Sequence, residues 1–119
     1  MQIRNYLTID VEDYFHVSAF ENISPPATWP DRQSRVERNT ERVLSRLEEA
    51  SVNANFFGRG WVADNYPKLV PQLAAAGHEI ASHGYLHQRV ALQDRATYRE
   101  DIRRSKQLLE DQSGRAVKG

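Results

Sequence analysis

The stretch Gly77–His87, GHEIASHGYLH, decides the fold that we predict for this chain. It consists of a glycine, a short apolar run and two histidines four residues apart, His83 and His87. A glycine commonly ends a helix, and a brief apolar run bounded by polar residues is typical of a buried strand. We therefore predict a helix that ends at Gly77 and a strand over 79–82 that delivers His83 at its carboxyl end.

Outward from this stretch, strand-like and helix-like patterns alternate along the chain. The predicted strands are 6–11, 53–57 and 79–82, and the predicted helices are 35–50, 67–77 and 97–114. The sequences that begin at Ser34 and at Thr97 have the capping-box pattern that starts helices. The order β-α-β-α-β-α predicts an α/β fold in which right-handed crossovers join parallel strands.

The segments between these elements carry less information. Residues 18–33 contain three prolines and show no periodicity, and we predict a long loop there that Trp29 anchors. His16 and His78 have no partner that the sequence identifies, and we interpret them as surface or loop-packing residues.

The composition excludes several classes of function. With 119 residues, of which 39% are hydrophobic, the chain suits one domain with a single core. Sixteen basic and sixteen acidic residues cancel and no basic block is present, so nucleic acid is not an expected partner. The chain contains no cysteine, which leaves histidines and carboxylates as the ligands for any metal.

Targeting signals are also missing from the sequence. The N-terminal residues lack the apolar stretch and cleavage site of a signal peptide, and no run is long enough to span a membrane. We therefore expect a cytoplasmic location and no membrane partner.

Three carboxylates lie at the end of the first predicted strand, namely those of Asp10, Glu12 and Asp13, and His83 and His87 follow the third. Carboxyl ends of parallel strands meet at one edge of a sheet, so we predict that these side chains converge on a divalent metal. Each group also has a simpler interpretation. The histidines can be two polar residues on one face of a turn, and the acids can form a solvated turn or a helix cap.

Residues 53–57 and 76–87 together resemble the polysaccharide deacetylase family with the NodB homology domain, in which helix, glycine, strand and histidine motif arrive in this order. The opening TIDVEDYF, residues 8–15, resembles the subgroup found with exopolysaccharide and exosortase gene systems. The family's His-Ser/Thr-x-x-His motif corresponds to HGYLH here, with Gly84 where Ser or Thr is usual. The resemblance covers essentially the whole chain and implies the N-terminal part of a distorted (β/α) barrel.

The resemblance also implies a role for each candidate residue. Asp10 matches the catalytic base of the family's first motif, whereas Val11 takes the place of its metal-binding Asp. Related deacetylases use an Asp-x-Asp variant of this motif. That variant makes Glu12 the ligand beside the two histidines, with Asp13 as a substitute.

The implied reaction is hydrolytic deacetylation of an N-acetylated or O-acetylated polysaccharide or oligosaccharide in exopolysaccharide biosynthesis. A divalent cation polarises the acetyl carbonyl, and Asp10 takes a proton from the attacking water. Zinc is the first choice, with iron, cobalt or nickel as alternatives. Tyr14 and Tyr85 are assigned to substrate binding.

The family continues, after a segment that resembles residues 114–119, into an Arg-x-Pro motif and later motifs that supply a general acid. We therefore expect residues 1–119 to form a truncated deacetylase domain, the N-terminal half only, with little or no activity. An unclosed barrel leaves a strand edge uncovered, so self-association is also expected.

Two alternatives remain open. A signalling receiver domain has about this length, the same alternation and an acidic cluster after its first strand, but it needs a phosphoacceptor Asp where this chain has His83. The second alternative is a non-catalytic relic that binds metal or carbohydrate without turnover.

Overall fold

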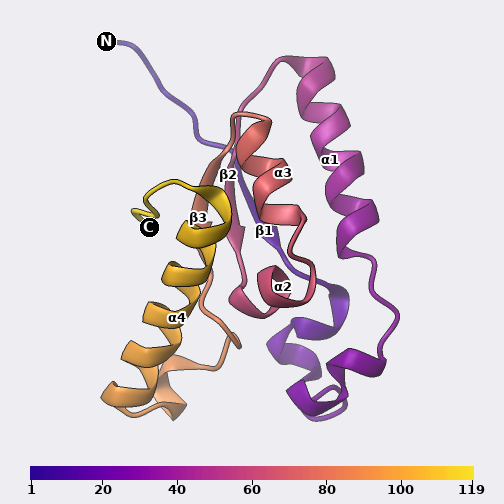
Figure 1. The fold of residues 1–119 in the computed structure, drawn as a ribbon, viewed down its shortest axis with the longest axis vertical. Helices are drawn as coiled ribbons and strands as arrows, with labels where there is room; N and C mark the ends of the chain where they lie inside the picture. The colour runs from indigo at the N-terminus through magenta and orange to yellow at the C-terminus, as the bar shows by residue number, and fades with distance from the viewer.

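The computed structural model describes all 119 residues as an α/β fold built on a three-stranded parallel sheet (Figure 1). The strands β1 (Thr8–Val11), β2 (Asn55–Gly58) and β3 (Glu79–Ser82) lie side by side in that order. The register pairs Val11 with Gly58 and Gly58 with Ser82, so all three carboxyl ends lie at one edge of the sheet. The predicted α/β fold with parallel strands is confirmed.

Four α-helices accompany the sheet: α1 (Val36–Ala50), α2 (Gly60–Asn65), α3 (Leu69–Ala75) and α4 (Arg95–Ser113). Helix α4 packs against β3, α2 and α3, whereas α1 lies beside α3 (Figure 1). Four short 3-10 helices complete the structure: η1 (Tyr14–His16), η2 (Ser18–Phe20), η3 (Pro26–Asp31) and η4 (Val90–Leu92). No helix has both the length and the apolar content that crossing a membrane requires.

The boundaries differ from the prediction where local signals were ambiguous. Strand β1 begins at Thr8 rather than at residue 6, and α2 lies in a segment for which no helix was predicted. Pro71 is the third residue of α3, where a backbone N–H has no intrahelical partner, so the helix accepts it. The predicted loop over 18–33 contains η2 and η3.

The segment 18–33 is held to the core by Trp29, as predicted. The Trp29 side chain is buried, and its indole N–H donates to the Ser24 carbonyl at 3.0 Å. Its ring packs at 5.2 Å between centroids against that of Trp61. This contact places the segment next to the strand edge where the candidate ligands lie.

His16 and His78 are both buried, so a surface position is wrong for both, whereas the alternative of packing against a loop agrees with the contact of His16 with Trp29. The His78 Nδ1 accepts from the Ala54 N–H at 3.2 Å, and its ring lies 5.1 Å from that of Phe56. His16 packs against Trp29 at 4.5 Å between ring centroids. Each imidazole contacts residues of another segment of the chain, and local sequence patterns do not predict such contacts.

The predicted capping boxes of the first and last helices are also wrong. The N-terminus of α1 is capped by Asp13, whose Oδ2 accepts from the Ser34 hydroxyl at 2.8 Å and from the Arg35 and Val36 N–H groups at 2.6 and 3.1 Å. Helix α4 starts earlier than predicted, because Asp94 accepts from the Thr97 N–H at 2.7 Å. In both cases a carboxylate satisfies the free N–H groups at the positive end of the helix.

Replacing Asp13 by Ala is expected to lower the free energy of unfolding by about 2 kcal/mol, because three donors at the start of α1 lose their acceptor. Asp13→Asn keeps one side-chain oxygen and should lose less than half as much. Urea denaturation followed by circular dichroism measures both values. A change below about 0.5 kcal/mol for Asp13→Ala would show that the cap contributes little.

Candidate metal centre

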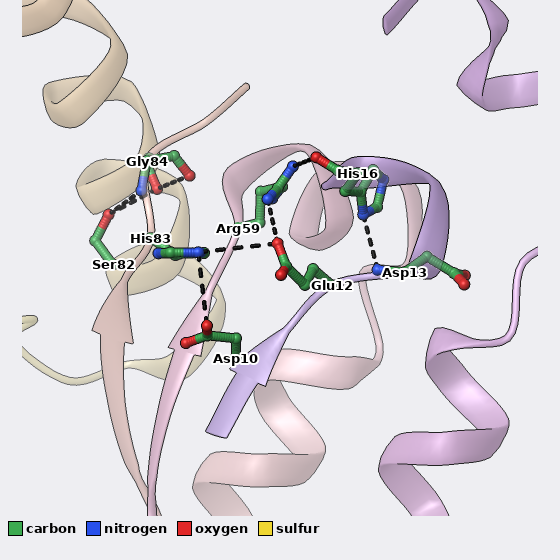
Figure 2. A network of polar contacts seen from close by, with 9 residues as sticks. Asp10, Glu12, Asp13, His16, Arg59, Ser82, His83 and Gly84 are labelled. Carbon is green, nitrogen blue, oxygen red and sulfur yellow. Dashed lines mark hydrogen bonds and ion pairs between the residues drawn. The ribbon is translucent and has the colours of Figure 1, made fainter. Parts of the chain in front are cut away.

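The shared strand edge brings the predicted site residues together. Asp10 lies in β1, Glu12 directly follows it, and His83 follows β3. The His83 Nε2 lies 3.8 Å from a carboxylate oxygen of Asp10 and 3.8 Å from one of Glu12 (Figure 2). One ligand atom from each of Glu12, His83 and His87 falls within 4.8 Å of the others. Residues about seventy positions apart in the sequence therefore form one cluster, as predicted, while their chemical roles remain predictions.

The turn that carries the two histidines has unusual backbone geometry. Gly84 has φ of 69° and His87 has φ of 59°, which is the left-handed region that residues other than glycine seldom adopt. The two imidazole rings lie 4.6 Å apart between centroids. Both oxygens of Asp101, on α4, hold this turn by accepting from the Tyr85 and Leu86 N–H groups at 2.8 and 3.2 Å. The surrounding structure thus maintains a backbone form that would otherwise be unfavourable.

Asp101 also explains why glycine occupies position 84. A Cβ added to Gly84 would lie 2.9 Å from the Asp101 Oδ2, and the positive φ disfavours any other residue. Nothing in the sequence singled out Asp101, because it is one of several acids on a predicted helix. A residue with Cβ at position 84 would disturb the contact that fixes the histidine turn.

Gly84→Ala is expected to lower the free energy of unfolding by about 2 kcal/mol, through backbone strain and the contact with Asp101. Gly114→Ala is the matched control, since Gly114 has nearly the same φ of 68° and nothing within 4 Å of an added Cβ. The control should lose about 1 kcal/mol, from strain alone. Equal losses in thermal or urea denaturation would show that the Asp101 contact does not constrain the turn.

Sequence patterns missed Arg59, which is completely buried at the end of β2. Its Nη2 donates to the Glu12 Oε2, and its Nη1 donates to the His16 carbonyl at 3.3 Å. Burial lowers the pKa of Arg59, and the neighbouring Glu12 carboxylate opposes this shift. The two flanking glycines suggested a turn, although the position of Arg59 at a strand end was a signal that could have identified it.

Asp13, predicted as a substitute for Glu12, is not part of this cluster. Its carboxylate caps α1 and points away from Glu12 and His83 (Figure 2). The substitute role is therefore wrong for this structure, because three donors at the helix N-terminus engage Oδ2 of Asp13 and the Tyr14 N–H donates to Oδ1. Glu12 is the carboxylate that the fold places beside the histidines.

The two tyrosines assigned to substrate binding have different surroundings. Tyr14 is exposed, and the Arg35 guanidinium lies 4.9 Å from its ring centroid. Tyr85 is buried, its hydroxyl donates to Asp64 at 2.7 Å, and burial raises its pKa to about 12. Substrate binding by either tyrosine remains a prediction.

His16 is a buried side chain next to Arg59, and it is neutral. Its Nδ1 accepts from the Asp13 N–H at 2.8 Å, and its Nε2 is buried without a hydrogen-bond partner in the chain. Burial, reinforced by the positive charge of Arg59, lowers the pKa of His16 to about 3. The protonated form is therefore disfavoured in the folded state.

Stability is expected to fall as the pH is lowered through the range between the unfolded pKa of His16, 6.5, and its folded value of about 3. In this range the unfolded state binds the extra proton, so the free energy of unfolding drops by up to about 1.4 kcal/mol per pH unit. Between about pH 6 and pH 4.5 the loss should reach about 2 kcal/mol. His16→Asn retains an acceptor for the Asp13 N–H. Its free energy of unfolding, measured by urea denaturation at several pH values, should fall less steeply with decreasing pH than that of the wild type. The same pH dependence in both proteins would contradict this account.

The residues at the cluster fit a divalent cation. Two imidazoles and a carboxylate form an N/O donor set of the kind that binds zinc or related ions. The His87 Nδ1 is buried without a hydrogen-bond partner in the chain, which suits an atom whose partner is not part of the polypeptide. Burial is the largest cause that lowers the pKa of His87, and the positive charge of Arg59 is the next. Both favour the neutral imidazole that ligation requires. A pocket of about 440 Å³ borders both histidines.

Comparison with known proteins identifies the family. The sequence model of polysaccharide deacetylases matches residues 24–119. The chain belongs to the polysaccharide deacetylase family. This membership excludes the receiver domain that the sequence alone had left open, and it agrees with the resemblance of the histidine motif. Assignment to the narrower subgroup associated with exopolysaccharide gene systems stays a prediction.

Two curated members of the polysaccharide deacetylase family match the chain over 79 residues, which are 66% of it. The identity is 33% to the peptidoglycan-N-acetylglucosamine deacetylase of Bacillus cereus and 37% to the chitooligosaccharide deacetylase of Sinorhizobium fredii. The matches cover 29% and 33% of those proteins, so the aligned part of the chain spans about a third of their length.

Two solved structures share the fold of this chain. A crystallised peptidoglycan N-acetylglucosamine deacetylase, Bc1960, superposes with a TM-score of 0.69 at 26% identity, over 93% of this chain and 42% of that one. A CE4 family pseudoenzyme from Bacillus anthracis superposes with a TM-score of 0.72 at 17% identity, over 95% and 32%. The second likeness concerns the fold alone.

Proposed function

We propose that the protein containing this chain is a divalent-metal-dependent deacetylase of an acetylated polysaccharide. The convergence of Glu12, His83 and His87 beside Asp10 is the observation that carries the proposal. Membership of the polysaccharide deacetylase family and the names of the two curated relatives support it. Zinc is the first candidate for the cation, with iron, cobalt or nickel as alternatives.

Each residue of the cluster has a distinct task in this proposal. Glu12, His83 and His87 would hold the cation, which when bound polarises an acetyl carbonyl and lowers the pKa of water. Asp10, whose side chain is 54% exposed, can accept a proton from water at its carboxylate. The pocket that borders His83 and His87 leaves room for a sugar beside the two imidazoles.

The N-acetyl group of an amino sugar is the favoured substrate. The Bacillus cereus relative is named for N-acetylglucosamine in peptidoglycan, and the Sinorhizobium fredii relative for chitooligosaccharide. A role in exopolysaccharide biosynthesis is the finer proposal, supported by the likeness of TIDVEDYF in residues 8–15 to the subgroup associated with those gene systems. An O-acetyl substrate is the alternative.

Residues 1–119 alone are proposed to bind the cation weakly and to turn over little substrate, because the family resemblance assigns the general acid for the leaving amine to a later motif. The outer edge of β3 is partly engaged, since the Ser82 N–H donates to the Gly119 carbonyl at 2.7 Å. The rest of the β3 edge can pair with a strand of a second copy, and this supports the proposal of self-association. A monomer by light scattering would contradict that second proposal.

Acetate release from N-acetylglucosamine oligomers tests the function. The parent protein should release acetate, lose this activity on chelation, regain it with added zinc, and lose it in Asp10→Asn. Release that survives chelation would contradict metal dependence. Stoichiometric metal binding without any release from acetylated oligosaccharides would identify the non-catalytic relic. The 119-residue chain is assayed in parallel and should release little or none.

A further inference from the structure

Arg59 introduces a positive charge into the candidate metal centre. Its side chain is fully buried, and it points from the end of β2 toward Glu12 (Figure 2). An arginine is seldom completely buried unless it is paired. The carboxylate that pairs with it belongs to a candidate metal ligand, so the role of Arg59 extends beyond packing.

Arg59 and the candidate cation site share one carboxylate oxygen. The Glu12 Oε2 that accepts from the Arg59 Nη2 also lies 3.8 Å from the His83 Nε2. The side chain of Glu12 remains 19% exposed, so packing alone does not fix it. The bond to Arg59 therefore determines where this carboxylate lies relative to the histidine.

Arg59 itself is held firmly. Its Nη1 donates to the His16 carbonyl at 3.3 Å, and its guanidinium lies 5.9 Å from the ring centroid of Trp29. A guanidinium is planar and presents its donors in a fixed fork. When Arg59 is held in place, its N–H groups therefore fix the position of the Glu12 carboxylate that accepts from them. Lysine, with a flexible stem and a single ammonium group, cannot make both contacts with this geometry.

We propose that Arg59 is a positioning residue that orients the Glu12 carboxylate toward His83 and His87 before a cation binds. This inference rests on the proposed function, because it assumes that Glu12 is a ligand. A guanidinium also repels a divalent cation, and this effect would weaken binding. Orientation of the carboxylate outweighs this repulsion, as for other groups that hydrogen-bond to ligating carboxylates.

The test compares Co²⁺ binding to wild type, Arg59→Lys and Arg59→Met by isothermal titration calorimetry and by the visible absorption of bound Co²⁺. Arg59→Met should lose about 10- to 100-fold in affinity and change the absorption spectrum, and Arg59→Lys should lose less. Arg103→Met is the matched control, because Arg103 is an exposed residue of α4 that pairs with Glu100. The control should bind as wild type does.

The outcomes separate this inference from the proposed function. If wild type does not bind Co²⁺, zinc or another of the candidate ions, the proposed function fails. If wild type binds and a folded Arg59→Met binds equally well or more tightly, the positioning role is overturned. If circular dichroism shows that Arg59→Met does not fold, Arg59→Lys decides, and unchanged affinity and spectrum in that variant overturn the proposal.

Discussion

Replacing Glu12 by Gln is expected to lower the free energy of unfolding by about 3 kcal/mol, although Glu12 is not a core residue. The reason is Arg59, which is completely buried and donates to the Glu12 carboxylate. Gln preserves the shape of the side chain but removes its charge. The buried guanidinium then lacks a compensating carboxylate, and breaking a buried ion pair from one side is strongly destabilising.

Urea denaturation of three variants checks this expectation. Asp10→Asn is the control, because its carboxylate is half-exposed and lies 3.8 Å from the His83 Nε2. It should change the free energy of unfolding by less than about 0.5 kcal/mol. The double variant Glu12→Gln with Arg59→Met should recover at least half of the loss, since the unpaired charge is gone. A single Glu12→Gln as stable as wild type would contradict the account.

His87→Asn is expected to reduce the affinity for zinc by more than about 100-fold, because it removes an imidazole from the candidate ligand set. This exceeds the 10- to 100-fold effect of removing groups that only orient ligands. Asparagine tolerates positive φ better than most residues, so the backbone at φ of 59° should persist. Deacetylation by the parent protein should disappear with the metal.

The control for this prediction is His78→Asn. His78 is another buried histidine, and its Nδ1 accepts from the Ala54 N–H, a role that the Asn oxygen can assume. Zinc affinity by competition with a chromogenic chelator should be unchanged in this variant. Comparable losses in both variants would mean that the affinity reports on global stability, and the assignment of His87 as a ligand would fail.

The parts of the structure that sequence reasoning predicted are those with a local signal. The apolar runs around Ile9, Phe56 and Ile80 indicated three strands, and their parallel order followed from the intervening helical patterns. The predicted burial of the first strand is wrong, since only Val11 of β1 is buried. Parallel strands bring their carboxyl ends to one edge of the sheet, and this rule predicts that Glu12 lies near His83, as the structure shows.

The parts that were missed depend on partners far away in the chain. Asp13 lies just after β1 yet caps α1, and Arg59 follows β2 yet is neutralised by a carboxylate that follows β1. Neither contact has a sequence spacing that a pattern can detect. Charged residues next to glycines usually lie at the surface, so the burial of Arg59 becomes evident only once the sheet is assembled.

The Arg59–Glu12 pair also limits how this protein can evolve. A lineage no longer under selection to keep Glu12 still could not lose it first, since the unpaired guanidinium of Arg59 would strongly destabilise the folded state. Replacement of Arg59 by an apolar residue has to come earlier or simultaneously. Among homologues of this chain, the residues at positions 12 and 59 should therefore covary, and the arginine should be absent wherever the acid has been lost.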